Sequence, residues 1–137
     1  MTPSPWPLRL AAVVAVLFGA LTVFSGGTAL FGGPEARIAV GDVVPFVLWF
    51  NFLAGFAYIA AGIGLWLHHP RAARLALLIA LATLVVFAAF GIHIAQGGAY
   101  ETRTVGAMTL RSLVWIAIAA TARRQDRLLE HFHADRT

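Results

Sequence analysis

The stretch VVPFVLWFNFLAGFAYIAAGIGLWL, residues 43–67, contains no formally charged side chain. A helix needs about 20 predominantly apolar residues to cross the ~30 Å hydrocarbon layer of a bilayer. Residues 10–34 form a second uncharged stretch of comparable length. Each stretch is therefore long enough to span a membrane as a helix.

Two further apolar segments follow, and each contains one polar or charged side chain that costs free energy to place in a membrane. Residues 75–100 contain only His93, and residues 105–122 contain only Arg111. Of the 137 residues, 60% are hydrophobic and 12% are charged, about half the charge of an average soluble protein. The core of a soluble domain of this length is too small to bury so much apolar surface.

These segments predict an all-α fold, an integral membrane four-helix bundle that forms a single domain over residues 1–137. The expected helices cover about residues 8–31, 44–67, 72–96 and 104–123, followed by a short basic tail at 124–137.

The first span is expected to be retained rather than cleaved as a signal peptide. Its uncharged stretch exceeds the apolar region of about 7 to 15 residues that signal peptides carry. Ser25, Gly26 and Gly27 are small enough for a cleavage site, but Phe24 and Thr28 flank them.

Turn-forming residues separate the predicted spans. Residues 32–34 (Gly-Gly-Pro), 68–70 (His-His-Pro) and 97–98 (Gly-Gly) should end the first three helices, and Thr102 or Thr104 could cap the fourth. The second and third helices should be antiparallel neighbours because the turn between them is short.

The arginines are distributed unevenly between the two sides of this bundle. Seven lie near the termini or in the turn between the second and third helices, and three lie on the other side. The positive-inside tendency then predicts cytoplasmic termini and a multi-pass protein of the cell inner membrane. The seven are Arg9, Arg71, Arg74, Arg123, Arg124, Arg127 and Arg136, and the three are Arg37, Arg103 and Arg111.

The tail alternates basic and acidic residues. We therefore expect it to be an amphipathic segment that lies along the lipid surface, and we expect no nucleic-acid binding.

Small and weakly polar residues recur at helical spacing. Such faces usually mark close helix contacts in lipid, where no water-driven force holds helices together. We expect packing rather than a ligand channel at both faces. The faces comprise Asn51, Gly55, Tyr58 and Gly62 in the second span and Gly19, Thr22 and Gly26 in the first.

Polar side chains of three predicted spans fall in one layer of the membrane. Arg111 lies roughly 10 Å inside the start of the fourth span, Asn51 has a similar depth, and His93 is about one turn inside the third. An arginine facing lipid near the centre costs about 2.5 to 3.5 kcal/mol, so Arg111 needs a partner or a wet cavity. Glu101 is the first candidate for its counter-charge and Asp42 the second.

Two main interpretations of this cluster remain open. In the structural one, Arg111 pairs with Glu101 to tie a loop to the fourth span, and His93 donates to a backbone carbonyl. In the binding one, Asn51, Tyr58, His93, Glu101 and Arg111 form an outward-facing site for an anion or for a lipid or quinone head group.

A third interpretation is a metal site made by His93, Glu101 and Asp42, whose nitrogen and oxygen ligands suit several divalent ions. The spacing of the three residues is not diagnostic. The chain contains no cysteine, which excludes thiolate ligands and cysteine nucleophiles. No phosphate-binding loop, G-x-S-x-G elbow or H-E-x-x-H helix is present, so no enzyme class and no cofactor are indicated.

Two segments resemble DoxX-like proteins. AGFAYIAAGIGLWLHHPRAARLALLIALATLVVF, residues 54–87, resembles their second and third helices, in which a glycine-rich helix ends in a short basic turn. LRLAAVVAVLFGALTVFSGG, residues 8–27, is similar to their first helix. The resemblance implies a small inner-membrane partner of redox systems, linked in some members to quinones or sulfur compounds.

The leading functional hypothesis from sequence is a non-enzymatic accessory or assembly subunit that contacts the lipid bilayer and other membrane subunits or copies of itself. The alternative is a binding protein or carrier for a small ligand, a metal or a quinone or lipid head group at the polar cluster. A quinone-linked redox subunit is the third hypothesis.

Overall fold

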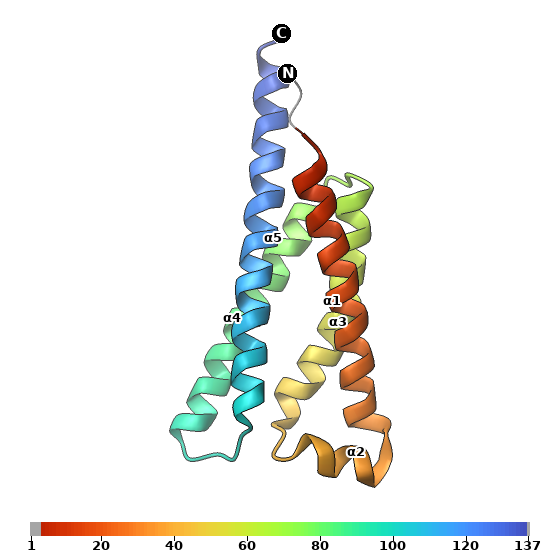
Figure 1. The fold of residues 1–137 in the computed structure, drawn as a ribbon. Helices are drawn as coiled ribbons and strands as arrows, with labels where there is room; N and C mark the ends of the chain where they lie inside the picture. Colours follow the sequence, from red (N-terminus) through yellow and green to blue (C-terminus); the bar gives the residue numbers. More distant parts are fainter. Residues whose placement is uncertain (1–3, 137) are drawn as a thin grey trace.

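The computed structural model describes residues 4–136, and these residues are arranged as helices joined by short loops (Figure 1). Residues 1–3 and 137, which the expected domain included, lie outside the described part. The helices are α1 (Trp6–Phe31), α2 (Gly33–Val40), α3 (Pro45–Trp66), α4 (Ala72–Ala95) and α5 (Thr102–Ala134). Four of them, α1, α3, α4 and α5, are long and apolar enough to cross a membrane. The prediction of an all-helical chain with four potential spans is confirmed.

The described part of the chain, residues 4–136, begins and ends at the same end of the bundle, which we call the terminal end (Figure 1). The short helix α2 and the loop between α4 and α5 lie at the opposite end, which we call the α2 end. This arrangement follows from four consecutive long helices that alternate in direction.

Glycine and proline end α1 where the sequence predicts, but a second helix follows at once. The chain turns at Gly33, whose φ of +84° lies in the region that favours glycine. Pro34 and Glu35 then occupy the first turn of α2, positions that suit a missing N–H and a negative charge. The eight-residue helix α2 was not expected from the sequence.

Helices α1 and α3 pack closely through glycine. A Cβ added at Gly19 would lie 2.8 Å from the Gly55 carbonyl oxygen, and one added at Gly62 would lie 2.9 Å from the Ala12 carbonyl oxygen. Backbones can approach this closely because glycine has no side chain. The predicted packing role is confirmed for the glycines of these faces.

Alanine also allows close helix packing elsewhere in the terminal half of the bundle. Ala72, Ala76 and Ala80 of α4 are buried and, at spacings of four, share one face of the helix. They belong to the same core as Ala119 and Ala122 of α5. This half of the bundle is therefore held together by close contacts between small side chains.

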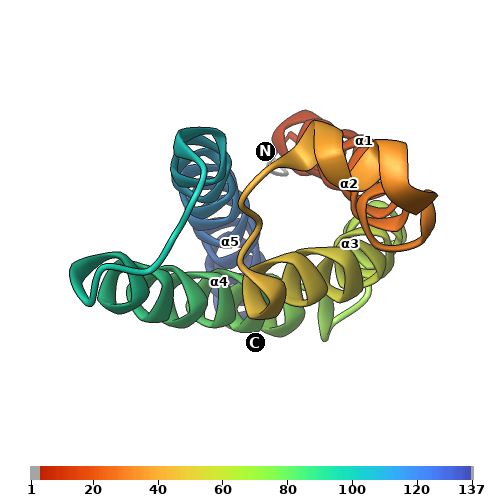
Figure 2. The ribbon, with the colours of Figure 1, turned by 90° about the horizontal axis from the view of Figure 1, so that it is seen from below.

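The bundle opens towards the α2 end. Helices α1 and α5 diverge there, with α2 and its following loop on one side and the α4–α5 loop on the other (Figures 1 and 2). The start of α3 stays packed against α4 and α5 through a buried cluster of Val44, Val47, Phe90 and Met108. Helix α1 packs against α3 along most of its length but meets α5 through few residues. A cleft between α1, α3 and α5 results.

Helix α5 corrects the expected end of the fourth span. It continues without a break from Thr102 to Ala134, 33 residues that extend about 50 Å. The expected helix ended near residue 123, and the tail was expected to lie along the lipid surface. Residues 107–134 contain no glycine or proline that would end the helix, so it extends beyond the rest of the bundle (Figure 1).

Candidate functional site

An aromatic layer, formed by Phe18, Tyr58 and Trp115, lies beside the deep end of the cleft, behind the lining residue Arg111. The Phe18 and Tyr58 rings stack with their centroids 5.8 Å apart, and the Tyr58 and Trp115 rings lie 4.7 Å apart. The three residues come from α1, α3 and α5, and both Tyr58 and Trp115 are fully buried. The layer separates the alanine-packed terminal half from the open half.

Arg111 lies on this aromatic layer. Its guanidinium carbon is 5.7 Å from the centre of the Phe18 ring, a cation–π contact. The side chain also interacts with Tyr58. Arg111 is nine residues from the start of α5, which places it about 13 Å along the helix axis, at membrane depth.

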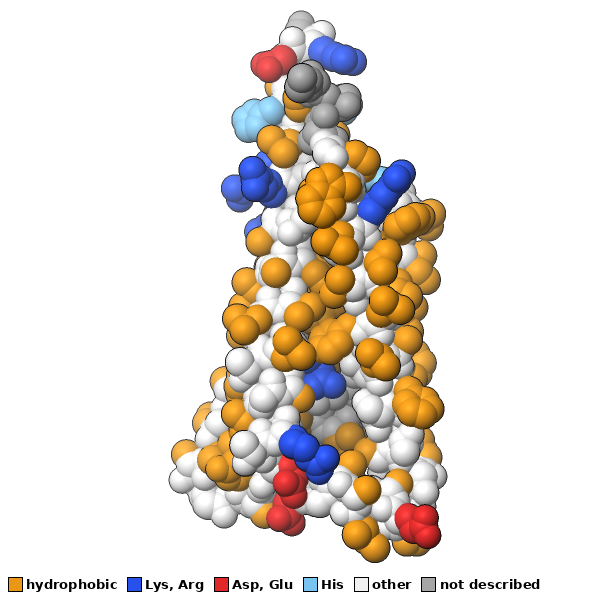
Figure 3. All heavy atoms as spheres, in the orientation of Figure 1, with side chains coloured by type: hydrophobic (Ala, Val, Ile, Leu, Met, Phe, Trp, Pro, Cys, Tyr) orange, Lys and Arg blue, Asp and Glu red, His pale blue; other side chains and the backbone are white. Residues whose placement is uncertain are grey.

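The cleft has a volume of about 270 Å³ and opens on the side of the bundle between α1 and α5. Figure 3 shows the molecule hollowed there, with basic side-chain atoms inside the hollow. Its polar lining residues are Thr22 and Ser25 of α1, Asn51 of α3, and Arg103, Thr104 and Arg111 of α5, with Glu101 just before α5.

The predicted ion pair between Arg111 and Glu101 is not formed among the described residues. Glu101 immediately precedes α5, ten residues before Arg111, so about 15 Å of helix separates the two backbones. The Glu101 carboxylate instead accepts the backbone N–H of Asp42 at 2.8 Å.

A second contact holds the same loop at the mouth of the cleft. The Arg103 guanidinium donates to the Ala39 carbonyl oxygen at 3.1 Å. Glu101 and Arg103 thus tie the end of α2 and the loop after it to the start of α5. The predicted tie between a loop and this helix exists, but Glu101 and Arg103 make it by separate backbone contacts.

Four buried side-chain atoms around the aromatic layer have no hydrogen-bond partner within residues 4–136: Asn51 Oδ1, Tyr58 OH, Arg111 Nε and Trp115 Nε1. Buried polar groups normally form hydrogen bonds. Where such a group at a cleft has no protein partner, water, an ion or a ligand can supply the missing partner. The four atoms include obligate donors on Arg111 and Trp115.

Thr83 of α4 adds a further polar group behind Tyr58. Its hydroxyl donates to the Ile79 carbonyl oxygen at 2.7 Å, and it lies near the Tyr58 hydroxyl without forming a hydrogen bond to it. A line of polar groups therefore crosses the bundle from Arg111 through Tyr58 to Thr83.

His93 lies apart from this line. Its Nε2 is 3.0 Å from the Ala99 carbonyl oxygen, so that nitrogen donates, as the structural interpretation predicts. The ring also meets Phe46 edge to face at 6.4 Å. His93 is not among the residues that line the cleft. Of the five predicted ligand-binding residues, Asn51, Glu101 and Arg111 line it, and Tyr58 lies in the aromatic layer beside it.

The predicted metal ligands His93, Glu101 and Asp42 are not assembled. Across the described part of the chain, no three histidine or acidic side chains form a group that could hold a metal ion. The physical reason is that the Glu101 carboxylate bonds to the backbone of Asp42, while His93 bonds to its own loop.

Sequence reasoning did not include Thr22 and Ser25 among the site residues. Thr22 was assigned to the packing face of α1, and it is indeed buried. It faces the cleft because α1 and α5 diverge at this level, and no local sequence pattern reports that divergence.

The cleft offers a permanent positive charge together with amide and hydroxyl groups, which are the groups that bind an oxyanion. Glu101 at the mouth is the one carboxylate among its lining residues, and it is already hydrogen-bonded to backbone. Comparison of the chain with protein-family models, with curated proteins and with solved structures finds no match.

Proposed function

We propose that this chain is a membrane-embedded binding protein that holds the oxyanion of a ligand, a carboxylate or a phosphate, against Arg111. The observation that carries the proposal is a permanent charge about 13 Å along a potential membrane span with no acidic partner among residues 4–136. Such a charge costs about 2.5 to 3.5 kcal/mol at the centre of a span. A bound anion offsets that cost.

The dimensions of the cleft define how much of a ligand it can hold. Its volume of about 270 Å³ is slightly below the range of about 300 to 1,000 Å³ for pockets that enclose a whole drug-sized ligand. A small free acid would fit inside. For an amphiphile, the head group would fit, and the apolar remainder would pass into the bilayer between α1 and α5.

Native mass spectrometry of the protein, extracted from its own membrane in mild detergent, tests the proposal. We expect a stoichiometric extra mass on the wild-type chain, and that mass distinguishes a free acid from an amphiphile. Arg111→Gln removes a charge-assisted hydrogen bond of about 1.5 to 3 kcal/mol, so affinity should fall about 10- to 150-fold.

Two variants at the mouth serve as controls. Arg103→Gln removes a charge that its bond to Ala39 holds at the mouth of the cleft, so it should weaken binding much less than Arg111→Gln does. Glu101→Gln keeps an acceptor for the Asp42 N–H and removes a negative charge, so binding should not weaken. If the wild-type chain carries no extra mass that Arg111→Gln loses, the proposal is contradicted.

A second candidate function is the accessory subunit of a membrane complex. It is favoured by α5, whose last turns extend beyond the bundle and expose parts of Leu128, Leu129 and Phe132. A carboxylate on a partner helix could also pair with Arg111. The same mass measurement would then show the mass of a protein partner. A quinone-linked redox role, implied by the DoxX-like resemblance, remains a prediction.

We further propose that the terminal end is cytoplasmic and that the cleft opens at the outer half of the inner membrane. The arginine distribution supports this orientation. The chain has no cysteine, so single cysteines introduced at Ile38 of α2 and His131 of α5 report each side. A membrane-impermeant maleimide should label Ile38→Cys in intact spheroplasts and His131→Cys only after lysis. The reverse pattern would invert the orientation.

A further inference from the structure

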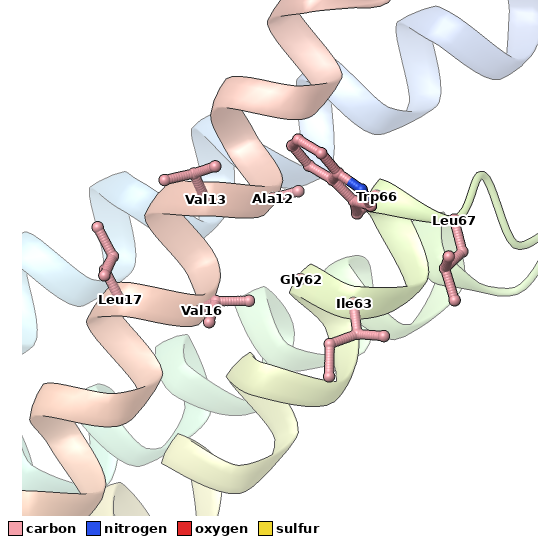
Figure 4. A pocket seen from close by; sticks show the side chains of 8 residues that line it. All are labelled: Ala12, Val13, Val16, Leu17, Gly62, Ile63, Trp66 and Leu67. Atoms are coloured by element: carbon pink, nitrogen blue, oxygen red, sulfur yellow. The ribbon is translucent and has the colours of Figure 1, made fainter.

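A second hollow, separate from the cleft, lies between α1 and α3 towards the terminal end. It is an apolar groove of about 260 Å³ that shares no lining residue with the cleft. Its walls include Val13, Val16 and Leu17 of α1 and Gly62, Ile63 and Trp66 of α3. Figure 4 shows these side chains around the groove, with the Trp66 ring reaching from α3 towards α1.

Arg9 lies at the terminal end of this groove. Arg9, Val13 and Leu17 are spaced by four residues and so share one face of α1. The Arg9 guanidinium carbon is 5.5 Å from the centre of the Trp66 ring. The positive charge is thus held over a residue that itself lines the groove.

The cation–π contact leaves Arg9 able to bind an anion. The contact uses the face of the guanidinium, and its N–H donors point outwards in the plane, where they can grip a phosphate in bidentate fashion. Arg9 is exposed, and no carboxylate pairs with it among residues 4–136.

We propose that this groove holds an acyl chain of an anionic phospholipid whose phosphate binds Arg9. From Arg9 to Leu17 the groove follows about 12 Å of helix, from the end of the spans into the apolar layer. One positive charge at the end of a wholly apolar groove complements a lipid, which carries its charge at one end of a hydrocarbon chain.

Photocrosslinking of the full chain in mixed phosphatidylglycerol and phosphatidylcholine vesicles tests this site. Either lipid carries a diazirine in its acyl chain, and tandem mass spectrometry maps the labelled residues. We expect phosphatidylglycerol to label residues 13–17 and 62–67 in preference to phosphatidylcholine. An excess of unlabelled phosphatidylglycerol should compete better than phosphatidylcholine.

Four variants complete the test, two that should change the labelling and one control for each. Arg9→Gln should lower phosphatidylglycerol labelling of the groove about fivefold, the effect of one arginine near a membrane surface. Arg74→Gln, an exposed arginine that does not touch Trp66, should leave it unchanged. Val13→Trp should fill the groove and abolish its labelling, whereas Val85→Trp on the exposed face of α4 should not.

Equal groove labelling by the two lipids, unaffected by Arg9→Gln, would overturn the proposal and leave only general lipid contact. A groove protected from both lipids would also overturn it and would indicate that another protein segment covers it. Because the labels are mapped to residues, an anion bound at Arg111 does not affect either result.

Discussion

Replacing Arg111 with methionine is expected to make the ligand-free protein more stable and unable to bind the anion. Methionine keeps a long unbranched side chain and removes a charge that has no acidic partner in the described structure. The lost contact with Phe18 contributes about 0.5 to 2 kcal/mol, whereas the removed burial cost is about 2.5 to 3.5 kcal/mol. A net gain of about 0.5 to 3 kcal/mol should result.

Circular dichroism during thermal unfolding in detergent measures this gain in stability. The ligand must be removed first, because a bound ligand would stabilise the wild type but not the variant. Arg103→Met is the matched control. That arginine lies at the exposed mouth and makes one hydrogen bond to Ala39, so its replacement should change stability little. If Arg111→Met instead unfolds the protein, Arg111 is a structural residue, and the binding proposal loses its basis.

Gly19→Ala is expected to destabilise the bundle by about 1 to 3 kcal/mol through overpacking. The new Cβ would lie 2.8 Å from the Gly55 carbonyl oxygen and 2.9 Å from the Tyr58 Cβ, so α1 and α3 would have to separate. Phe18 is the neighbouring residue, so the aromatic layer under Arg111 should shift as well. We therefore expect weaker anion binding in the same variant.

Gly106→Ala is the matched control, because a Cβ there meets nothing within 4 Å. It should raise stability by about 0.5 to 1 kcal/mol, the usual advantage of alanine over glycine inside a helix. Unfolding of both variants by dodecyl sulfate in mixed micelles gives the comparison. Equal effects of the two substitutions would show that α1 and α3 do not approach each other through Gly19.

Several features of this protein follow from local sequence patterns. Apolar length predicts the four potential spans, and glycine, proline and histidine predict where α1, α3 and α4 end. The spacing of Gly55 and Gly62 predicts the packing face of α3, which the close approach of α1 confirms. These predictions succeed because length, turn chemistry and helical spacing are properties of short segments.

The composition of the site was decided by the tertiary structure. Depth along a helix places Arg111 and His93 in neighbouring layers, yet only Arg111 faces the cleft, because the cleft lies between α1, α3 and α5 and no residue of α4 lines it. Likewise, Glu101 is close to Arg111 in the sequence but about 15 Å away along a straight helix. The sequence determines which residues share a helix face and roughly how deep each lies. The rotation and splay of the helices determine which of those faces meet. The glycine contacts of α1 with α3 and the alanine contacts of α4 with α5 set that rotation and splay.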